Sequence, residues 1–273
     1  MPDSRLFKGC SLLQLSCKLT GNRPQSATFH TATLVAIRKM KITLAIFTTL
    51  FLSSIVFGQD SKVSSRQLKQ QEIDSIFTDS LKTKLQIEYS IYRIYQYRDK
   101  SGEHFIVMTE NEFECDEKEK CFDTIKAFCY SYKDGIYNLE WNLKDFILQK
   151  GNEVSEEYSI SFWTKYFELN DYNGDGLVDP ILVYGTFGMN GTSDGRIKIL
   201  VYHKGKKRAI RHQNGTLDFE RNTRVDEMYY QLPTEIQNRV QEIMETITEN
   251  DHGIFPYGWK TAMKNQKLKF DEN

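Results

Sequence analysis

The chain of 273 residues contains 36 Lys and Arg against 37 Asp and Glu, 40% hydrophobic residues, and only 16 Gly and 5 Pro. This composition is typical of a packed globular protein and excludes a disordered, collagen-like or coiled-coil chain. A formal net charge of −1 without a dense basic run also argues against a nucleic-acid partner, because such proteins need a basic surface to neutralise phosphates.

An export signal is predicted over residues 40–58. Basic residues at 38, 39 and 41 precede an apolar run over 42–57, and Val56-Phe57-Gly58 offers small or modest side chains for cleavage. The run is shorter than the roughly 20 residues that span a bilayer. We therefore expect an exported protein, periplasmic or extracellular, with no membrane span after cleavage. An uncleaved membrane anchor is the alternative.

The rest of the chain divides at this signal. Because Met40 has its own basic flank, we expect translation to start there and residues 1–39 to be an upstream extension outside the native protein, which N-terminal sequencing would test. Residues 59–85 are predicted to form a helix or a linker, and residues 86–273 a single domain. The first 58 residues hold seven basic side chains and one acidic side chain, so the remainder is more acidic.

Three cysteines follow the predicted cleavage site. Cys115 and Cys121 flank a charged stretch at the tip of a predicted hairpin, where a disulfide would form in an oxidising compartment. Cys129 shares an alternating face with Ile125 and Ala127, which predicts a buried, free thiol acting as a small apolar residue.

Most of the domain carries β-strand patterns. Alternating, β-branched or aromatic runs predict strands over 87–98, 105–109, 121–132, 137–146, 159–169, 180–184, 196–203 and 207–212. Turn residues separate several of these runs, and Asn214-Gly215 is a favoured hairpin pair. The simplest architecture is one mainly antiparallel sheet of about six to nine strands.

A C-terminal amphipathic helix is predicted after Pro233. Its apolar residues recur on one helical face, namely Ile236, Val240, Ile243, Met244 and Ile247. Packing of this face on the sheet is the favoured interpretation, and a partner surface is the alternative. The predicted fold class is α+β, a mainly antiparallel β-sheet with this helix packed on it.

The most specific motif is Asp171-Tyr172-Asn173-Gly174-Asp175-Gly176-Leu177-Val178-Asp179. Oxygen-bearing side chains stand at positions 1, 3, 5 and 9, a glycine at position 6, and a backbone carbonyl is available at position 7, which is calcium-loop spacing. Position 12, where an EF-hand places a bidentate Glu, is Leu182, and both flanks read as strands.

The loop instead resembles the Asp-x-Asp-x-Asp-Gly-x-x-Asp calcium loops of FG-GAP and VCBS repeats, which join two strands. The resemblance covers about twenty residues and occurs once, so it does not predict a propeller. By that resemblance the cofactor is calcium, and the ligands are Asp171, Asn173, Asp175, Leu177 through its carbonyl, and Asp179. A metal-free acidic turn is the alternative.

Other candidate sites are less specific. The segment Gly185–Gly195 is predicted to be a flexible loop near the ion, either a ligand-binding loop or a plain connection, and it lacks the ending of a phosphate-binding loop. His212 with Arg208 and Arg211 suggests an anion site or a solvated basic hairpin. Three aromatic residues could be sugar platforms or core, namely Trp141, Trp163 and Tyr184.

Catalytic residues cannot be selected from the sequence. It has no nucleophile elbow, zinc helix or Cys-x-x-Cys pair. A glycosidase would need two carboxylates at a defined separation, and the chain offers many candidates. They include Glu110, Glu140, Asp145, Asp218 and Glu220.

Several ordered segments between Tyr95 and Trp259 resemble a small family of exported bacterial proteins labelled surface polysaccharide biosynthesis proteins. They include Arg-Asp-Lys-Ser-Gly-Glu-His, Leu-Glu-Trp, the calcium loop, Val-Tyr-Gly-Thr, Met-Asn-Gly-Thr, Asp-Gly-Arg-Ile-Lys and Arg-His-Gln-Asn-Gly. The resemblance implies a role in making or displaying envelope polysaccharide and carries no catalytic residues.

We therefore expect an exported calcium-binding protein with an accessory, non-catalytic role in surface polysaccharide biosynthesis or display. Its partner would be a cell-surface polysaccharide or an envelope protein. The alternatives are a glycan-active enzyme that uses a carboxylate pair and a periplasmic protein-binding module.

Overall fold

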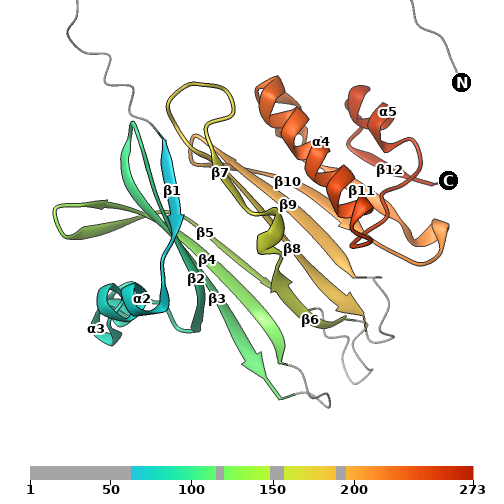
Figure 1. Ribbon diagram of the computed structural model, residues 1–273. Coiled ribbons are helices and arrows are strands. Elements are labelled where there is room, and N and C mark those ends of the chain that lie inside the picture. Colours follow the sequence, from blue (N-terminus) through green and yellow to red (C-terminus); the bar gives the residue numbers. More distant parts are fainter. Residues whose placement is uncertain (1–62, 115–119, 148–156, 189–194, 273) are drawn as a thin grey trace, which may run out of the picture. The chain divides into compact units, whose positions relative to one another are not determined.

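The computed structural model describes residues 63–114, 120–147, 157–188 and 195–272, all of which belong to one compact unit, Gln59–Asn273 (Figure 1). The predicted upstream extension and signal peptide lie outside the described residues, as does Cys115 of the predicted disulfide. Over the described ranges, the helices are too short or too polar to cross a membrane.

The first five strands form sheet A in chain order. Each strand pairs antiparallel with the next one along the chain. The strands are β1 (Ser64–Gln67), β2 (Ser90–Asp99), β3 (Gly102–Phe113), β4 (Cys121–Lys133) and β5 (Ile136–Phe146). The hairpins predicted around 99–102 and 133–135 are confirmed, and Asp134 and Gly135 both adopt the positive φ that a tight two-residue turn requires.

The remaining strands form sheet B, also antiparallel. The order is β12-β11-β10-β9-β8-β6, and β7 also pairs with β8. The strands are β6 (Glu157–Phe162), β7 (Glu168–Asn170), β8 (Asp179–Gly188), β9 (Arg196–His203), β10 (Lys206–Gln213), β11 (Asn222–Val225) and β12 (Lys269–Asp271).

Short helices lie outside the two sheets. In Figure 1, α2 (Gln70–Ile76) and α3 (Asp79–Lys84) lie beside sheet A, and α4 (Thr234–Glu249) and α5 (Trp259–Lys264) lie beside sheet B. Three 3₁₀ turns complete the described elements, namely η1 (Thr164–Tyr166), η2 (Asp218–Glu220) and η3 (Glu227–Gln231).

Three apolar clusters hold these layers together. One lies between α2, α3 and the outer face of sheet A and includes Phe77 and Phe105. A second lies between the sheets and includes Ile106 and Leu182. The third includes Ile181 and Val201 of sheet B and Met244 of α4. The result is two sheets face to face with helices on the outside.

The prediction of mainly antiparallel β structure is confirmed, whereas the prediction of one sheet is wrong. The described residues form twelve strands in two sheets. The reason is that β8 and β9 are apolar on both faces, so each face buries against a different layer: Leu182 and Leu200 point to the cluster between the sheets, and Ile181 and Val201 to the α4 side.

Three local predictions also need correction. Residues 59–85 were expected to be helix or linker, but β1 precedes two short helices there. The run 159–169 is interrupted by η1 and divides into β6 and β7. Asn214-Gly215 does not form a two-residue hairpin, because the chain passes through η2 before β11 pairs with β10. Cys129 is buried and free, as predicted.

Candidate functional site

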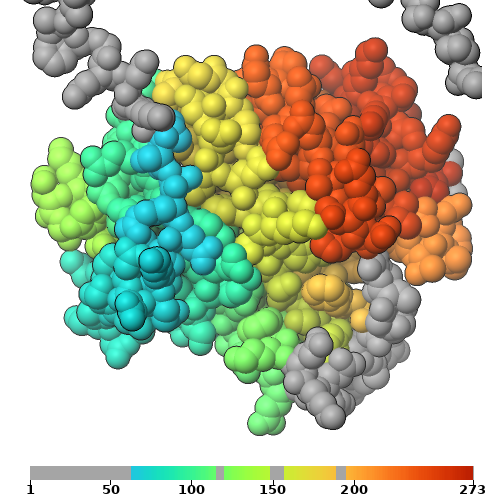
Figure 2. Space-filling model, viewed as in Figure 1, coloured from blue at the N-terminus to red at the C-terminus, as the bar shows by residue number. Residues whose placement is uncertain are grey.

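The candidate calcium loop connects β7 to β8, which pair antiparallel with Asn170 opposite Asp179. Its flanks are therefore strands, as the sequence predicts, and no helix pair of the EF-hand type is formed. The loop lies at the surface of the unit, in the upper yellow part of Figure 2. Gly174 and Gly176 adopt φ values of 70° and 83°, which glycine tolerates better than other residues.

Side-chain oxygens turn inward and fix the loop. The two carboxylate oxygens of Asp171 accept the backbone amides of Asp175 at 3.1 Å and Gly176 at 2.8 Å. Asn173 Oδ1 also accepts the Asp175 amide at 3.1 Å, and Asp175 Oδ1 accepts the Leu177 amide at 3.0 Å. A carboxylate oxygen has a second lone pair, so these bonds orient the oxygens and leave capacity for a cation.

Asp179 is the most buried of the predicted ligands, with 1% of its surface exposed. Its Oδ1 lies 2.7 Å from His203 Nδ1, and its Oδ2 has no hydrogen-bond partner among the described residues. Burial raises the pKa of this carboxyl, although the contact with His203 opposes the rise. An unpartnered buried carboxylate oxygen is costly unless something compensates it, and a cation would do so.

Two lysines occupy cation positions at the same loop. Lys204 Nζ lies 3.3 Å from Asp175 Oδ2, and Lys100 Nζ donates to the carbonyl oxygen of Asp175. In this conformation no three His, Cys, Asp or Glu side chains of the described ranges are grouped to hold a metal. The donor types fit Ca²⁺, but Asp175 and Asp179 would have to turn from Lys204 and His203 toward the ion.

The loop is fastened to sheet A by the turn between β2 and β3. Lys100 donates its amide to the Gly176 carbonyl at 3.0 Å, and the Val178 amide donates to Asp99 Oδ2 at 3.0 Å. Burial opposes ionisation of Asp99, but the nearby His104 ring and hydrogen bonds from Ser101 and Val178 outweigh it and hold the pKa of Asp99 well below its ordinary value. The loop therefore joins the two sheets as well as β7 and β8.

Sequence reasoning located the loop oxygens and missed the groups that surround them. Asp99, Lys100, His203 and Lys204 come from turns and strand ends far away in the chain. The Asp99-Lys-Ser-Gly stretch carries a turn signal, but nothing in the linear pattern indicates that this turn contacts residues 176–178.

The prediction that Gly185–Gly195 is a loop near the ion is wrong. Residues 185–188 are the last part of β8, and residues 189–194 lie outside the described residues. Along β8, Gly185 is six residues beyond Asp179, the last residue of the calcium loop, which is about 20 Å at roughly 3.3 Å per residue.

The aromatic candidates have different environments. Trp141 stacks on Tyr202 with ring centroids 3.7 Å apart, and Tyr184 is buried between the sheets. Trp163 and Tyr166 line a cavity of about 310 Å³ near the carboxyl end of β8, where the Tyr166 hydroxyl lies 2.7 Å from His252 Nδ1.

His212 does not belong to a solvated basic hairpin. It is 2% exposed, its Nδ1 lies 3.0 Å from Thr223 Oγ1, and its ring packs on Phe255. Burial lowers the pKa of His212 to about 4, so the imidazole is neutral near pH 7 and cannot hold an anion by charge. Arg211 is paired with Asp226 instead.

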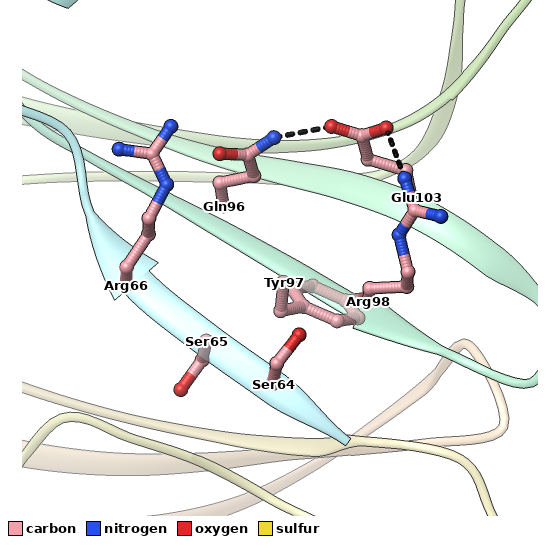
Figure 3. Close-up of a pocket in the computed structure, with 7 residues that line it drawn as sticks. All are labelled: Ser64, Ser65, Arg66, Gln96, Tyr97, Arg98 and Glu103. Carbon is pink, nitrogen blue, oxygen red and sulfur yellow. Dashed lines mark hydrogen bonds and ion pairs between the residues drawn. The ribbon is translucent and has the colours of Figure 1, made fainter. Parts of the chain in front are cut away.

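A hollow of about 240 Å³ lies beside edge strand β1 (Figure 3). Its polar side chains largely satisfy one another: Glu103 accepts from Gln96 and from Arg98, and the Arg66 guanidinium lies 2.6 Å from Glu72. Gln96 Oε1, in contrast, is buried without a hydrogen-bond partner among the described residues.

Two of the candidate carboxylates, Glu110 and Asp145, lie on strands on either side of β4. Glu110 of β3 and Asp145 of β5 are buried, and Ile125 of β4 lies in register between them. Lys198 and Arg196 bind Asp145 and lower its pKa against the effect of burial. Glu110 and Asp145 are therefore separated by strand β4, on which the buried Ile125 lies opposite both residues.

Glu110 gives a testable pH dependence. Burial raises its pKa from 4.5 to about 7, against weaker opposing effects from the Phe162 amide and Arg93. The folded state therefore binds a proton more tightly than the unfolded state, so the stability contributed by protonated Glu110 is present below pH 4.5 and is lost as pH rises to about 7.

We expect Glu110→Gln to remove this dependence and to stabilise the protein at pH 8 by about 1 to 3 kcal/mol relative to the wild type. Urea unfolding of both proteins at pH 5 and pH 8 measures the effect. If the difference in free energy of unfolding between the two proteins were the same at pH 5 and pH 8, Glu110 would not be the source of the pH dependence.

Comparison with protein-family models finds no match. No curated protein and no solved structure is significantly similar to the chain either. The resemblance to exported surface polysaccharide proteins therefore rests on sequence motifs alone.

Proposed function

We propose that the loop Asp171–Asp179 binds calcium and that the protein is an exported accessory factor stabilised by this ion. The observation that carries the calcium proposal is the loop itself: a strand-flanked turn whose inward side-chain oxygens are already oriented by backbone amides, with Asp179 Oδ2 buried and unpartnered.

In this proposal the ion stabilises the contact between the loop and sheet A. The loop is bonded to the β2–β3 turn through Gly176 and Val178, so a cation that stiffens it also stiffens the junction of the sheets. The amphipathic helix α4 serves as the cover of sheet B and not as a partner surface, since its apolar residues share one buried cluster with that sheet.

The accessory role in surface polysaccharide assembly is supported by the predicted export signal and the sequence resemblance. A non-catalytic role agrees with the separation of the buried carboxylates Glu110 and Asp145 by Ile125. Fractionation of cells that produce the tagged protein tests export, and recovery in the cytoplasm with an intact N-terminus would contradict it.

Calcium binding is tested by thermal unfolding in EDTA and across a calcium titration at constant ionic strength. A ligand that binds only the native state stabilises it by about 2.7 kcal/mol at a concentration one hundred times its Kd. We expect Tm to rise with calcium in the wild type and not in the Asp171→Asn, Asp175→Asn variant, which keeps one acceptor oxygen at each position and loses one of the two amide contacts of Asp171.

Lys204→Gln is the matched variant for the competing ammonium. It removes the contact with Asp175 Oδ2, so calcium should bind more tightly and the Tm rise should begin at lower calcium concentration. An equal Tm rise in the doubly substituted loop variant would place the ion elsewhere, and no rise at millimolar calcium would reduce the motif to a metal-free turn.

A further inference from the structure

A cavity of about 230 Å³ lies between the two sheets, next to the calcium loop. Sheet A contributes Tyr97, His104 and Trp141 to its lining, sheet B contributes Tyr202, and the loop contributes Leu177. Aromatic rings thus form part of the walls, beside charged residues such as Asp99 and Glu140 and aliphatic residues such as Val178.

His104 offers a bare lone pair here. The Ser101 hydroxyl lies 2.5 Å from the carboxylate oxygen of Asp99 and donates its only proton to it. The same hydroxyl oxygen lies 2.9 Å from His104 Nε2, so it accepts the Nε2 proton. This network places a proton on Nε2, so that in the neutral imidazole Nδ1 is a hydrogen-bond acceptor. His104 Nδ1 is buried and has no hydrogen-bond partner in the described chain.

The aromatic residues add a second buried polar atom and several ring faces. Tyr202 is 2% exposed, and its hydroxyl is buried without a described partner. Its ring stacks on Trp141, and the Tyr97 ring stacks on His104 with centroids 4.7 Å apart. The negative faces of such rings attract cations, most strongly where water is excluded.

Charges around the cavity favour a cation as well. Asp99 and the exposed Glu140 both line it. Burial is the main cause that raises the pKa of the Cys129 thiol to about 12, and the negative charges of Glu140 and Asp99 raise it further. The negative charges of the same two carboxylates also raise the pKa of the Tyr97 hydroxyl, in addition to the effect of burial. The one lining ammonium, on Lys204, is turned to Asp175.

We propose that this cavity binds a small organic ammonium ion, which donates an N–H to His104 Nδ1 and sets its charge against Glu140 and the aromatic rings. An ammonium supplies the donor that Nδ1 lacks, and its hydrocarbon part suits the ring-lined walls. His104, Glu140 and the aromatic rings are not predicted ligands of calcium, and Leu177, which also lines the cavity, would give the ion only its backbone carbonyl.

Isothermal titration calorimetry of the protein in EDTA tests the proposal with 2-phenylethylamine and its uncharged isostere 2-phenylethanol. We expect the amine to bind at least about tenfold more tightly than the alcohol, since only the amine gains the charge interactions. Equal affinities, or no binding of the amine, would overturn the proposal.

Two variants locate the binding. Glu140→Gln should weaken amine binding about three- to tenfold, whereas Glu227→Gln, an exposed carboxylate elsewhere, should leave it unchanged. His104→Phe keeps an aromatic ring on Tyr97, removes the acceptor, and should abolish preference for the amine over the alcohol. If His104→Phe does not fold, as judged by circular dichroism, the Glu140→Gln variant is the deciding test. An unchanged affinity of that variant for 2-phenylethylamine would overturn the proposal.

The calcium titration is read separately. Because the calorimetry is done in EDTA, absence of amine binding would not contradict calcium binding by the loop. In the same way, absence of a calcium effect on Tm would not contradict amine binding in the cavity.

Discussion

Leu182→Ala is expected to destabilise the protein by about 3 to 5 kcal/mol, the upper part of the range for removing a buried leucine side chain. Leu182 is fully buried in β8 and contributes to the cluster between the sheets. It lies opposite Leu200 of β9. Because layers cover β8 on both faces, the surrounding chain has little freedom to collapse into the space that the lost atoms would leave.

Urea unfolding of Leu182→Ala beside Leu139→Ala measures this effect. Leu139 is the same residue type on a strand of sheet A, but it is 52% exposed. Its substitution should change the free energy of unfolding by no more than about 0.5 kcal/mol. Comparable losses in the two variants would mean that β8 is not the buried centre of the fold.

Glu157→Gln is expected to cost about 3 kcal/mol, because the partly buried Arg196 guanidinium loses its bidentate partner and keeps only the more distant Asp145 carboxylate at 3.6 Å. Both carboxylate oxygens of Glu157 accept from the Arg196 guanidinium, from Nε and from Nη2, and Thr186 Oγ1 donates to the same carboxylate at 3.1 Å. The guanidinium also donates to the Phe146 carbonyl at 2.8 Å, so the pair ties sheet B to the end of sheet A.

The double variant Glu157→Gln, Arg196→Met separates charge from packing. Removing both charges should recover a large part of the lost stability, because no unpaired guanidinium is left. Glu112→Gln is the surface control, since its partner Lys120 is 72% exposed and such pairs contribute about 0 to 1 kcal/mol. If Glu157→Gln lowers the free energy of unfolding as little as Glu112→Gln does, the interaction between Glu157 and Arg196 is screened by solvent.

Strand positions were predictable because alternation and turn residues are local. The pairs 87–98 with 105–109 and 121–132 with 137–146 match β2 to β5 closely. The division into two sheets was not predictable, since an apolar run such as 180–184 indicates a strand buried on both faces without naming its neighbours. Strand β1 escaped detection because all four of its residues are exposed and polar.

The local part of the candidate calcium site was also predictable, whereas its contacts with distant residues were not. Loop spacing located five candidate ligands and the strands on either side, because a metal loop is contiguous in sequence. The contacts of Asp175 with Lys204 and of Asp179 with His203 depend on how the β9–β10 turn meets this loop. The cavity with His104 and Tyr202 needs both sheets in place, so no single segment of the chain encodes it.

The order of strands in sheet A bears on how the chain folds. Every strand from β1 to β5 pairs with its immediate neighbour in the sequence. The pairings from β2 to β5 close short loops, which have a low entropic cost and favour fast folding, whereas the connection from β1 to β2 is longer and contains α2 and α3. A chain that emerged from a translocation channel with its N-terminus first could assemble this sheet hairpin by hairpin, before any residue of β8 had arrived. Sheet B would then form against the folded sheet A, which shortens the time during which the apolar strands of sheet B are exposed and can aggregate.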